Sequence, residues 1–141
     1  MIFIAHRGNT NGIKSNYENG QKYCQDAINK GYHVEIDVQW YEGIFWTGHD
    51  RPQYRVDTDF LKKKEVWCHA KGIQVLYELQ KIEAHCFFHQ KDDVTLTSQG
   101  YLWTAPLHKL TPKSICVLPE LQRVDYTDCA GLCSDFVERY K

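Results

Sequence analysis

Two carboxylates lie two residues apart in the stretch HVEIDVQWYEGIFWTGHD, which covers residues 33–50. Glu35 and Asp37 alternate with aliphatic residues, the period-two pattern of a β-strand, so their side chains project from the same face. Strand geometry puts the two positions about 7 Å apart, and like charges that close are costly unless a cation or a proton lies between them. The spacing therefore favours a cation site, although a half-exposed strand with a solvated polar face shows the same alternation.

Histidines and cationic side chains fall at the carboxyl ends of the predicted strands. They are His6, Arg7, His49, His69 and Lys71. Because the carboxyl ends of parallel strands meet at one edge of a sheet, we expect these groups and the carboxylate pair to converge in one pocket. Such a pocket suits a phosphodiester: a divalent cation withdraws charge from the phosphoryl group, guanidinium and ammonium groups bind its oxygens, and two imidazoles share the roles of base and acid.

The elements that must position these residues alternate between strands and helices over the first two-thirds of the chain. Short apolar runs predict strands over 2–5, 34–38, 43–47, 65–70, 86–88, 101–105, 114–118 and 131–134; helical spacing predicts a helix ending at Lys30, a second over 72–84 and a short one within 57–64. Strand, helix and strand in succession indicate a parallel βαβ unit. We therefore predict an α/β barrel or open α/β sheet with its site at the carboxyl ends of the strands.

The first predicted helix has two candidate starting points. Ser15 followed by Glu18 fits a capping box, and Asn19 is an alternative cap. Gly31 is placed to end this helix in the left-handed conformation.

Composition limits the class of protein. The 141 residues contain no linker, which predicts a single domain over 1–141. The net charge is −1, from 17 basic and 18 acidic residues, so the chain lacks the excess of positive charge that nucleic-acid binding usually needs. No run approaches the ~20 apolar residues that span a bilayer, which argues against a stable membrane anchor.

The first residues and the cysteines bear on the cellular compartment. The start, MIFIAHRG, is too short for the apolar segment of a secretory signal, so we expect a cytoplasmic protein. Its six cysteines are then expected to be reduced and mostly part of the core. Cys129 and Cys133 have no companion pair at the spacing of a zinc ribbon, which argues against zinc there.

Four motifs resemble those of the glycerophosphodiester phosphodiesterase family, in the superfamily shared with phosphatidylinositol-specific phospholipases C. They are AHRGN at 5–9, YENG at 17–20, NKGYHVEIDV at 29–38 and GHD at 48–50. Their order and spacing are similar to the family's over residues 3–50. The later likenesses are thinner: WCHAK at 67–71, YLWTA at 101–105 and AGLCSDF at 130–136.

The resemblance implies a TIM-type (β/α) barrel and metal-dependent hydrolysis of glycerophosphodiesters to glycerol 3-phosphate and an alcohol. It assigns the acid–base pair to His6 and His49, the Mg²⁺ or Ca²⁺ ligands to Glu35 and Asp37, and phosphate binding to Arg7 and Lys71. It also implies attack by a hydroxyl of the substrate through a cyclic phosphate. Which of the two histidines is acid and which is base stays open.

Two features depart from the family's pattern. A full barrel takes about 250 residues, so we expect a reduced TIM-type (β/α) barrel, with fewer or shorter helices and a more open site. His69 stands where the family has its third metal-binding carboxylate. Because imidazole is a softer ligand than carboxylate, we expect weaker binding of Mg²⁺ or Ca²⁺ and a preference for Zn²⁺ or Mn²⁺. His89, Asp92 or Asp93 could supply the third ligand instead.

The leading hypothesis is a metal-dependent phosphodiester hydrolase that acts on glycerophosphodiesters or related small phosphodiesters. One alternative is a non-catalytic phosphate-binding module of the same fold, which the altered third ligand suggests. The short interval between His49 and WCHAK at 67–71 suggests it too, because it leaves no room for the substrate-capping insertion that these enzymes often carry. Another is a lyase-type phospholipase that releases a cyclic phosphate. In each case the partner is a small-molecule phosphodiester, and the oligomeric state is left open.

Overall fold

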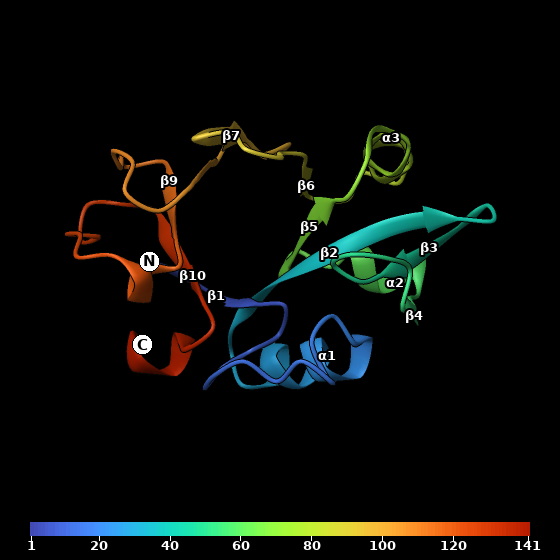
Figure 1. The fold of residues 1–141 in the computed structure, drawn as a ribbon, viewed down its shortest axis with the longest axis horizontal. Helices are drawn as coiled ribbons and strands as arrows, with labels where there is room; N and C mark the ends of the chain where they lie inside the picture. The colour runs from blue at the N-terminus through green and yellow to red at the C-terminus, as the bar shows by residue number, and fades with distance from the viewer.

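The computed structural model describes residues 1–141 as one curled, mixed β-sheet with three α-helices around it (Figure 1). The ten strands are β1 (Ile2–His6), β2 (His33–Tyr41), β3 (Ile44–Thr47), β4 (Tyr54–Arg55), β5 (Val66–Ala70), β6 (Cys86–Phe87), β7 (Val94–Leu96), β8 (Leu102–Thr104), β9 (Ser114–Val117) and β10 (Gly131–Ser134). The helices are α1 (Gln21–Asn29), α2 (Thr58–Leu61) and α3 (Ile73–Lys81), and short 3₁₀ turns cover Pro119–Leu121 and Val137–Arg139.

The long strand β2 organises the sheet. Its first half pairs in parallel with β1 on one side and with β5 on the other, and its second half pairs antiparallel with β3. Beyond β1 the sheet continues in parallel through β10, β9 and β8, and beyond β5 it continues in parallel to β6. The parallel strands therefore bring their carboxyl ends to one edge, as expected from the distribution of polar residues.

The prediction of a reduced TIM-type barrel is wrong. β3, β4 and β7 pair antiparallel, and the chain forms a curled mixed sheet in which helices do not alternate regularly with strands. The crossovers at 105–113 and 118–130 contain no α-helix. The first is shorter than the roughly 10–12 residues that a helical crossover takes. The second begins with a 3₁₀ turn at Pro119, a residue that cannot lie inside an α-helix without losing a hydrogen bond.

The predicted strands and helices exist, with ends shifted by a few residues. All eight predicted strands and all three predicted helices are present. The capping prediction is wrong, because Gly20 precedes α1 and no side chain caps the helix. Gly31 ends this segment with φ +91°, as predicted. The strands β4 and β7 were not predicted, since two or three residues are too few to show an alternating pattern.

The core lies on both faces of the sheet. Aliphatic residues of β2 point outward and pack beneath α1 and α3, which lie outside the curl (Figure 1). A second cluster fills the inside with Ile4, Trp67, Phe87, Trp103, Ile115 and Cys133. Each large buried side chain contributes roughly 1.5–3 kcal/mol to stability. Because side chains alternate along β2, its carboxylates lie on the face opposite Val34 and Ile36.

α1 and α3 are the longest helices, with nine residues each. No helix combines the length and the apolar composition that crossing a bilayer would require.

The close pairing of β1 with β10 can be tested at Gly131. A Cβ there would collide with the backbone oxygen of Ile2 and lie 2.8 Å from its Cβ. We expect Gly131→Ala to lower the free energy of unfolding by about 1–3 kcal/mol, measured by urea denaturation. Gly72→Ala is the matched control, because no atom lies within 4 Å of its added Cβ and the backbone is extended. Equal losses for the two variants would contradict the pairing described here.

Candidate functional site

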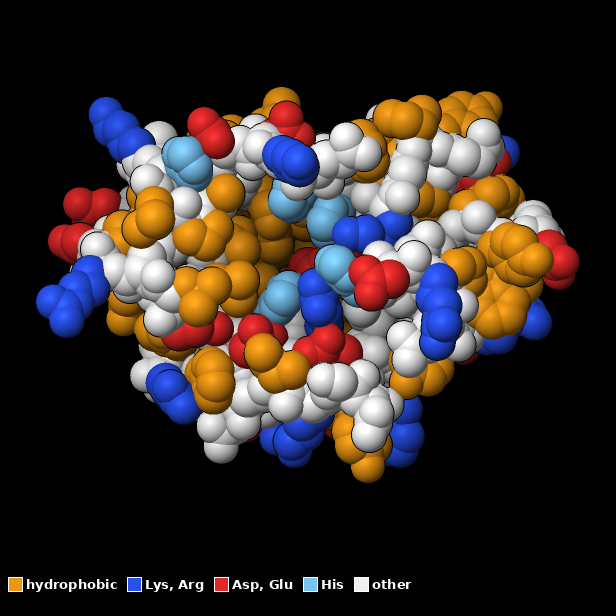
Figure 2. Space-filling model, in the orientation of Figure 1, with side chains coloured by type: hydrophobic (Ala, Val, Ile, Leu, Met, Phe, Trp, Pro, Cys, Tyr) orange, Lys and Arg blue, Asp and Glu red, His pale blue; other side chains and the backbone are white.

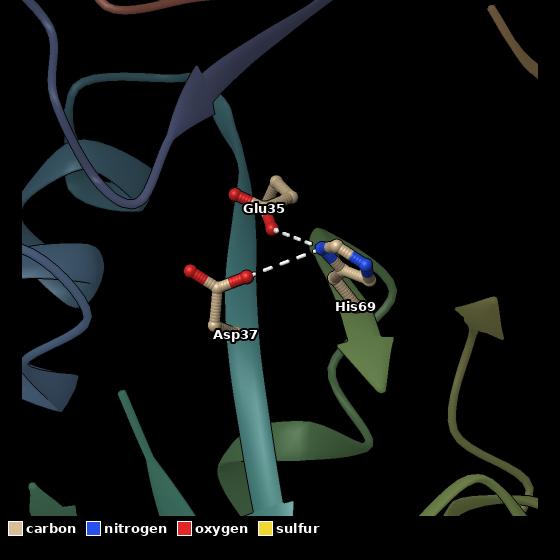
Figure 3. Close-up of side chains that lie close together, drawn as sticks. All are labelled: Glu35, Asp37 and His69. Atoms are coloured by element: carbon tan, nitrogen blue, oxygen red, sulfur yellow. Dashed lines mark ion pairs between the residues drawn. The ribbon is translucent and has the colours of Figure 1, made fainter. Parts of the chain in front are cut away.

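Glu35, Asp37 and His69 form a buried cluster on β2 and β5. The register pairs Asp37 with His69, and each carboxylate residue is only 1% exposed. The Nδ1 atom of His69 lies 3.2 Å from Asp37 Oδ1 and 3.7 Å from Glu35 Oε1 (Figure 3). One ligand atom from each of the three residues lies within 4.8 Å of the others. The carboxylate pair is therefore enclosed, and the reading as a solvated strand face is wrong.

The two nitrogens of His69 have different surroundings. Nε2 lies 3.3 Å from the backbone oxygen of His89 and can only donate to it. In the neutral imidazole, Nδ1 would then present a lone pair to two carboxylates, which is repulsive unless a cation or a proton lies between them. Burial by itself lowers the pKa of His69, but hydrogen bonds to Asp37 and Glu35 and their charges outweigh it and raise this pKa to about 9.

The donor set fits a divalent cation. Two carboxylates and an imidazole offer three atoms to one point, and the remaining N–H of His69 is bonded to a backbone carbonyl, as is usual for histidines that ligate metals. In the metal-free protein, a proton on His69 supplies positive charge between the imidazole and the two carboxylates, as a bound cation would.

Asp37 is the most heavily compensated carboxylate of the site. Arg7 Nε lies 3.1 Å from its Oδ2, Asn19 Nδ2 donates to the same oxygen at 3.0 Å, and Lys71 Nζ lies 3.9 Å from Oδ1. Burial by itself raises the pKa of Asp37, but His69, Arg7 and Lys71 together hold it well below its usual range. Asp37 is therefore ionised at any physiological pH.

Arg7 connects the first loop to both carboxylates. Its backbone N–H donates to Glu35 Oε2 at 3.2 Å, and its Nη1 donates to Glu18 Oε2 at 3.2 Å. While making these two bonds, Arg7 has a left-handed backbone with φ +53°, a conformation that few non-glycine residues adopt. The turn continues at Gly8 with φ +86°, where a Cβ would lie 2.9 Å from Tyr23 Cδ1. Gly8 is thus needed to bend the chain after β1.

His6 forms a pair with a carboxylate that directly follows the last strand, β10. Its Nδ1 lies 2.8 Å from Asp135 Oδ1, and its Nε2 lies 3.8 Å from Glu35 Oε2. Asp135 is held in turn by Asn9 Nδ2, which donates at 2.8 Å, and by its own N–H, which donates to Glu120 Oε1. Burial lowers the pKa of His6, but Asp135 and Glu35 outweigh it and raise the pKa above its ordinary value.

His49 lies apart from the buried cluster. Its side chain is 46% exposed, and its Nδ1 lies 2.6 Å from Asp50 Oδ1. It lines the same pocket as His6 and Arg7, so the structure places it at the mouth rather than at the floor. The two histidines that were assigned together thus have different environments, one fixed and one open.

The three alternative candidates for the third metal ligand lie at different places relative to the pocket. His89 stacks on His69 with ring centroids 4.6 Å apart, and Asp92 also lines the pocket. Asp93 is not part of the pocket lining and lies 3.2 Å from His108 Nε2 instead. His69 is therefore the candidate that meets both carboxylates directly.

Three residues of the site escaped the sequence analysis: Glu18, Asn19 and Asp135. Asp135 directly follows the predicted strand 131–134, so its position at a strand end was an available signal. Glu18 and Asn19 belong to the YENG motif but were interpreted as helix caps. Asn19 instead adopts φ +66° and bonds both the carboxylate and the backbone N–H of Asp37. No local pattern reveals a contact of that kind.

A pocket of about 260 Å³ lies at the carboxyl ends of the strands, and its polar lining includes His6, Arg7, Glu35, Asp37, His49 and His69. Figure 2 shows a hollow with histidine, Lys and Arg side chains on one side and hydrophobic side chains on the other. The apolar side includes Trp103, Val117 and Leu118. The pocket therefore combines acidic, cationic and titratable groups with one uncharged wall.

A scan against protein-family models found no match to this chain, and comparisons with curated proteins and with solved structures found none either. The likeness to glycerophosphodiester phosphodiesterases therefore rests on the sequence motifs alone.

The raised pKa of His69 predicts how stability depends on pH. The folded protein keeps this proton up to about pH 9, whereas the unfolded chain loses it around pH 6.5. The stabilisation is thus fully present below pH 6.5 and is lost as the pH rises through 9. We expect the free energy of unfolding of the chelator-treated protein to fall by about 3 kcal/mol over this range. His69→Gln should make this slope shallower in urea titrations, with the remaining slope coming from His6, whose pKa is also raised. An unchanged slope would contradict the assignment.

Proposed function

We propose that this chain is a metal-dependent phosphodiester hydrolase. The observation that supports it most is the convergence of two buried carboxylates on the Nδ1 atom of His69, whose other nitrogen is occupied by a backbone carbonyl. Glu35, Asp37 and His69 would hold the ion. An ion bound there would withdraw charge from a phosphoryl group. The mixed oxygen and nitrogen donors favour Mn²⁺ or Zn²⁺, and Mg²⁺ or Ca²⁺ remain the alternatives from the family resemblance.

The residues around this centre have roles that follow from their positions. Arg7 and Lys71 carry positive charge beside Asp37 and would bind the phosphate oxygens. Asp135 holds the Nδ1–H of His6, which leaves Nε2 to take a proton from an attacking hydroxyl or to give one to the leaving alcohol. His49 at the mouth would take the complementary role. The assignment of acid and base between the two stays open.

One observation favours a second candidate, a phosphate-binding module without catalysis. A proton on His69 offsets part of the charge of the carboxylate pair without any metal, because the pKa of His69 is raised to about 9. The pocket would then attract an anion through the charges of Arg7, Lys71 and the imidazolium groups. Binding of phosphate in the presence of chelator, with no turnover when metals are added, would favour this candidate.

We also propose a cytoplasmic location. All six cysteines are unpaired and five of them are buried, as expected for a chain that folds in a reducing compartment.

Metal dependence is the direct test of the proposed activity. Protein stripped with EDTA should not hydrolyse glycerophosphocholine or bis(p-nitrophenyl) phosphate, and added Mn²⁺ or another divalent ion should restore hydrolysis. Asp37→Asn should weaken metal binding, measured by calorimetry, and lower kcat/KM by about 10²-fold or more. Asp125→Asn is the control, because Asp125 lies in an exposed turn with Thr127. Full activity in EDTA would refute the proposal.

The pair of His6 with Asp135 predicts a change in the pH profile. We expect His6→Ala to abolish activity and Asp135→Asn to lower kcat by about 10²-fold, because the imidazole loses the partner that orients it. Since Asp135 raises the pKa of His6, the limb of the pH–rate profile that belongs to His6 should move to lower pH in Asp135→Asn. A purely structural role of Asp135 would lower the rate and leave that limb in place.

A further inference from the structure

A second hollow lies away from the pocket at the carboxyl ends of the strands. It has a volume of about 680 Å³ and is lined by residues of α1, of β4 and of the loop before α1. It shares no lining residue with the pocket that contains Glu35 and Asp37. Its volume falls within the roughly 300–1,000 Å³ that is usual for small-molecule sites. The hollow is therefore a candidate ligand site that the proposed hydrolysis does not use.

Three tyrosines line this hollow, which we call the tyrosine hollow: Tyr17, Tyr23 and Tyr54. The ring centroids of Tyr17 and Tyr23 are 5.8 Å apart at an interplanar angle of 33°, so the two rings are neighbours that do not stack face to face. The Tyr23 hydroxyl is fixed because it donates to Asn9 Oδ1 at 3.0 Å. Tyr17 is 61% exposed. A planar ring lying on Tyr17 would remove apolar surface from water and add a stacking interaction.

Hydrogen bonds between separate segments hold the walls of the tyrosine hollow together. The Tyr54 hydroxyl donates to the backbone oxygen of Asn16 at 2.9 Å, which joins β4 to the loop before α1. The side chain of Gln21 donates to Asp57 Oδ2 and accepts from the Asp57 N–H, both at 2.8 Å, which joins α1 to the segment after β4. A site formed before its ligand arrives loses less conformational entropy on binding.

Cationic side chains surround the three rings. Lys14, Lys22 and Arg55 line the tyrosine hollow together with a single carboxylate, that of Asp26. Lys22 Nζ lies 3.1 Å from Asp26 Oδ2, whereas Lys14 and Arg55 form no ion pair. This is a local excess of positive charge in a chain whose net charge is −1. It favours an anionic ligand and disfavours the organic cations that aromatic rings otherwise bind.

We infer that the tyrosine hollow binds a mononucleotide, with its base on Tyr17 and its phosphate at Lys14 and Arg55. Bases of every kind stack on aromatic side chains, and ammonium and guanidinium groups bind phosphate oxygens. A phosphate alone would leave the rings uncovered, and an uncharged ring would leave the two cations without a partner. Because the whole chain carries a net charge of −1, a single nucleotide fits better than a polymer.

Calorimetry with three related ligands tests this inference. AMP is a phosphomonoester, so the proposed hydrolase does not consume it, and EDTA keeps metal out of the other pocket. We expect AMP to bind at least ten-fold more tightly than adenosine or ribose 5-phosphate, because each of these carries only one of the two recognised parts. Equal affinity for AMP and ribose 5-phosphate would overturn the inference, as would the absence of AMP binding at millimolar concentration.

Two variants separate the base from the phosphate. Tyr17→Ala should lower the affinity for AMP and adenosine by about five-fold or more and leave that for ribose 5-phosphate unchanged. Lys14→Gln should lower the affinity for AMP and ribose 5-phosphate but not that for adenosine. Tyr77→Ala is the matched control, because Tyr77 on α3 is 56% exposed and has Lys81 Nζ 5.2 Å from its ring centroid. Equal losses in Tyr17→Ala and Tyr77→Ala would overturn the inference.

A further variant tests where the nucleotide binds, since the other pocket also carries cations. Lys71 Nζ lies 3.9 Å from Asp37 Oδ1, in the site of the proposed hydrolysis. Lys71→Gln should leave the affinity for AMP unchanged. Loss of AMP binding in Lys71→Gln but not in Tyr17→Ala would place the nucleotide in the other pocket and overturn the inference. Because these measurements need neither metal nor turnover, failure of the proposed hydrolysis would leave this inference standing.

Discussion

The structure depends on the compensation of two buried negative charges. Glu35 and Asp37 are enclosed on the inner face of β2, where an isolated carboxylate would be too costly to keep ionised. Arg7, His69 and Lys71 surround Asp37 and hold its pKa well below the usual range. Removing one partner of such a buried group leaves a buried charge uncompensated, which strongly destabilises the fold.

The parallel pairing of three strands provides this compensation. β1 delivers Arg7 and His6 at one edge of β2, and β5 delivers His69 at the other, in direct register with Asp37. The loops add what the strands cannot, since Asn19 and Asp135 arrive from the segments before α1 and after β10. The site therefore needs no complete ring of helices. A short chain can build it because the required residues follow strands that lie side by side.

The same edge of the sheet also explains the two-sided pocket. The charged groups lie on β1, β2 and β5 or directly after them, whereas β8, β9 and the residue after β9 contribute Trp103, Val117 and Leu118. An anion at Arg7 would then face polar and charged groups on one side and apolar side chains on the other. This asymmetry is a property of the strand order, because the acidic and the apolar strands lie on different parts of the curled sheet.

The sequence by itself determined eight of the ten strands, the helices and the residue types at the strand ends, because periodicity and short apolar runs are local signals. It also indicated that Glu35 and Asp37 share a face. Only the tertiary structure decided that the sheet is mixed rather than a barrel, that His69 meets both carboxylates, and that His49 lies at the mouth. The contacts of Asn19 became visible only there, since strand order and loop path depend on pairings between residues far apart in the chain, which no local pattern encodes.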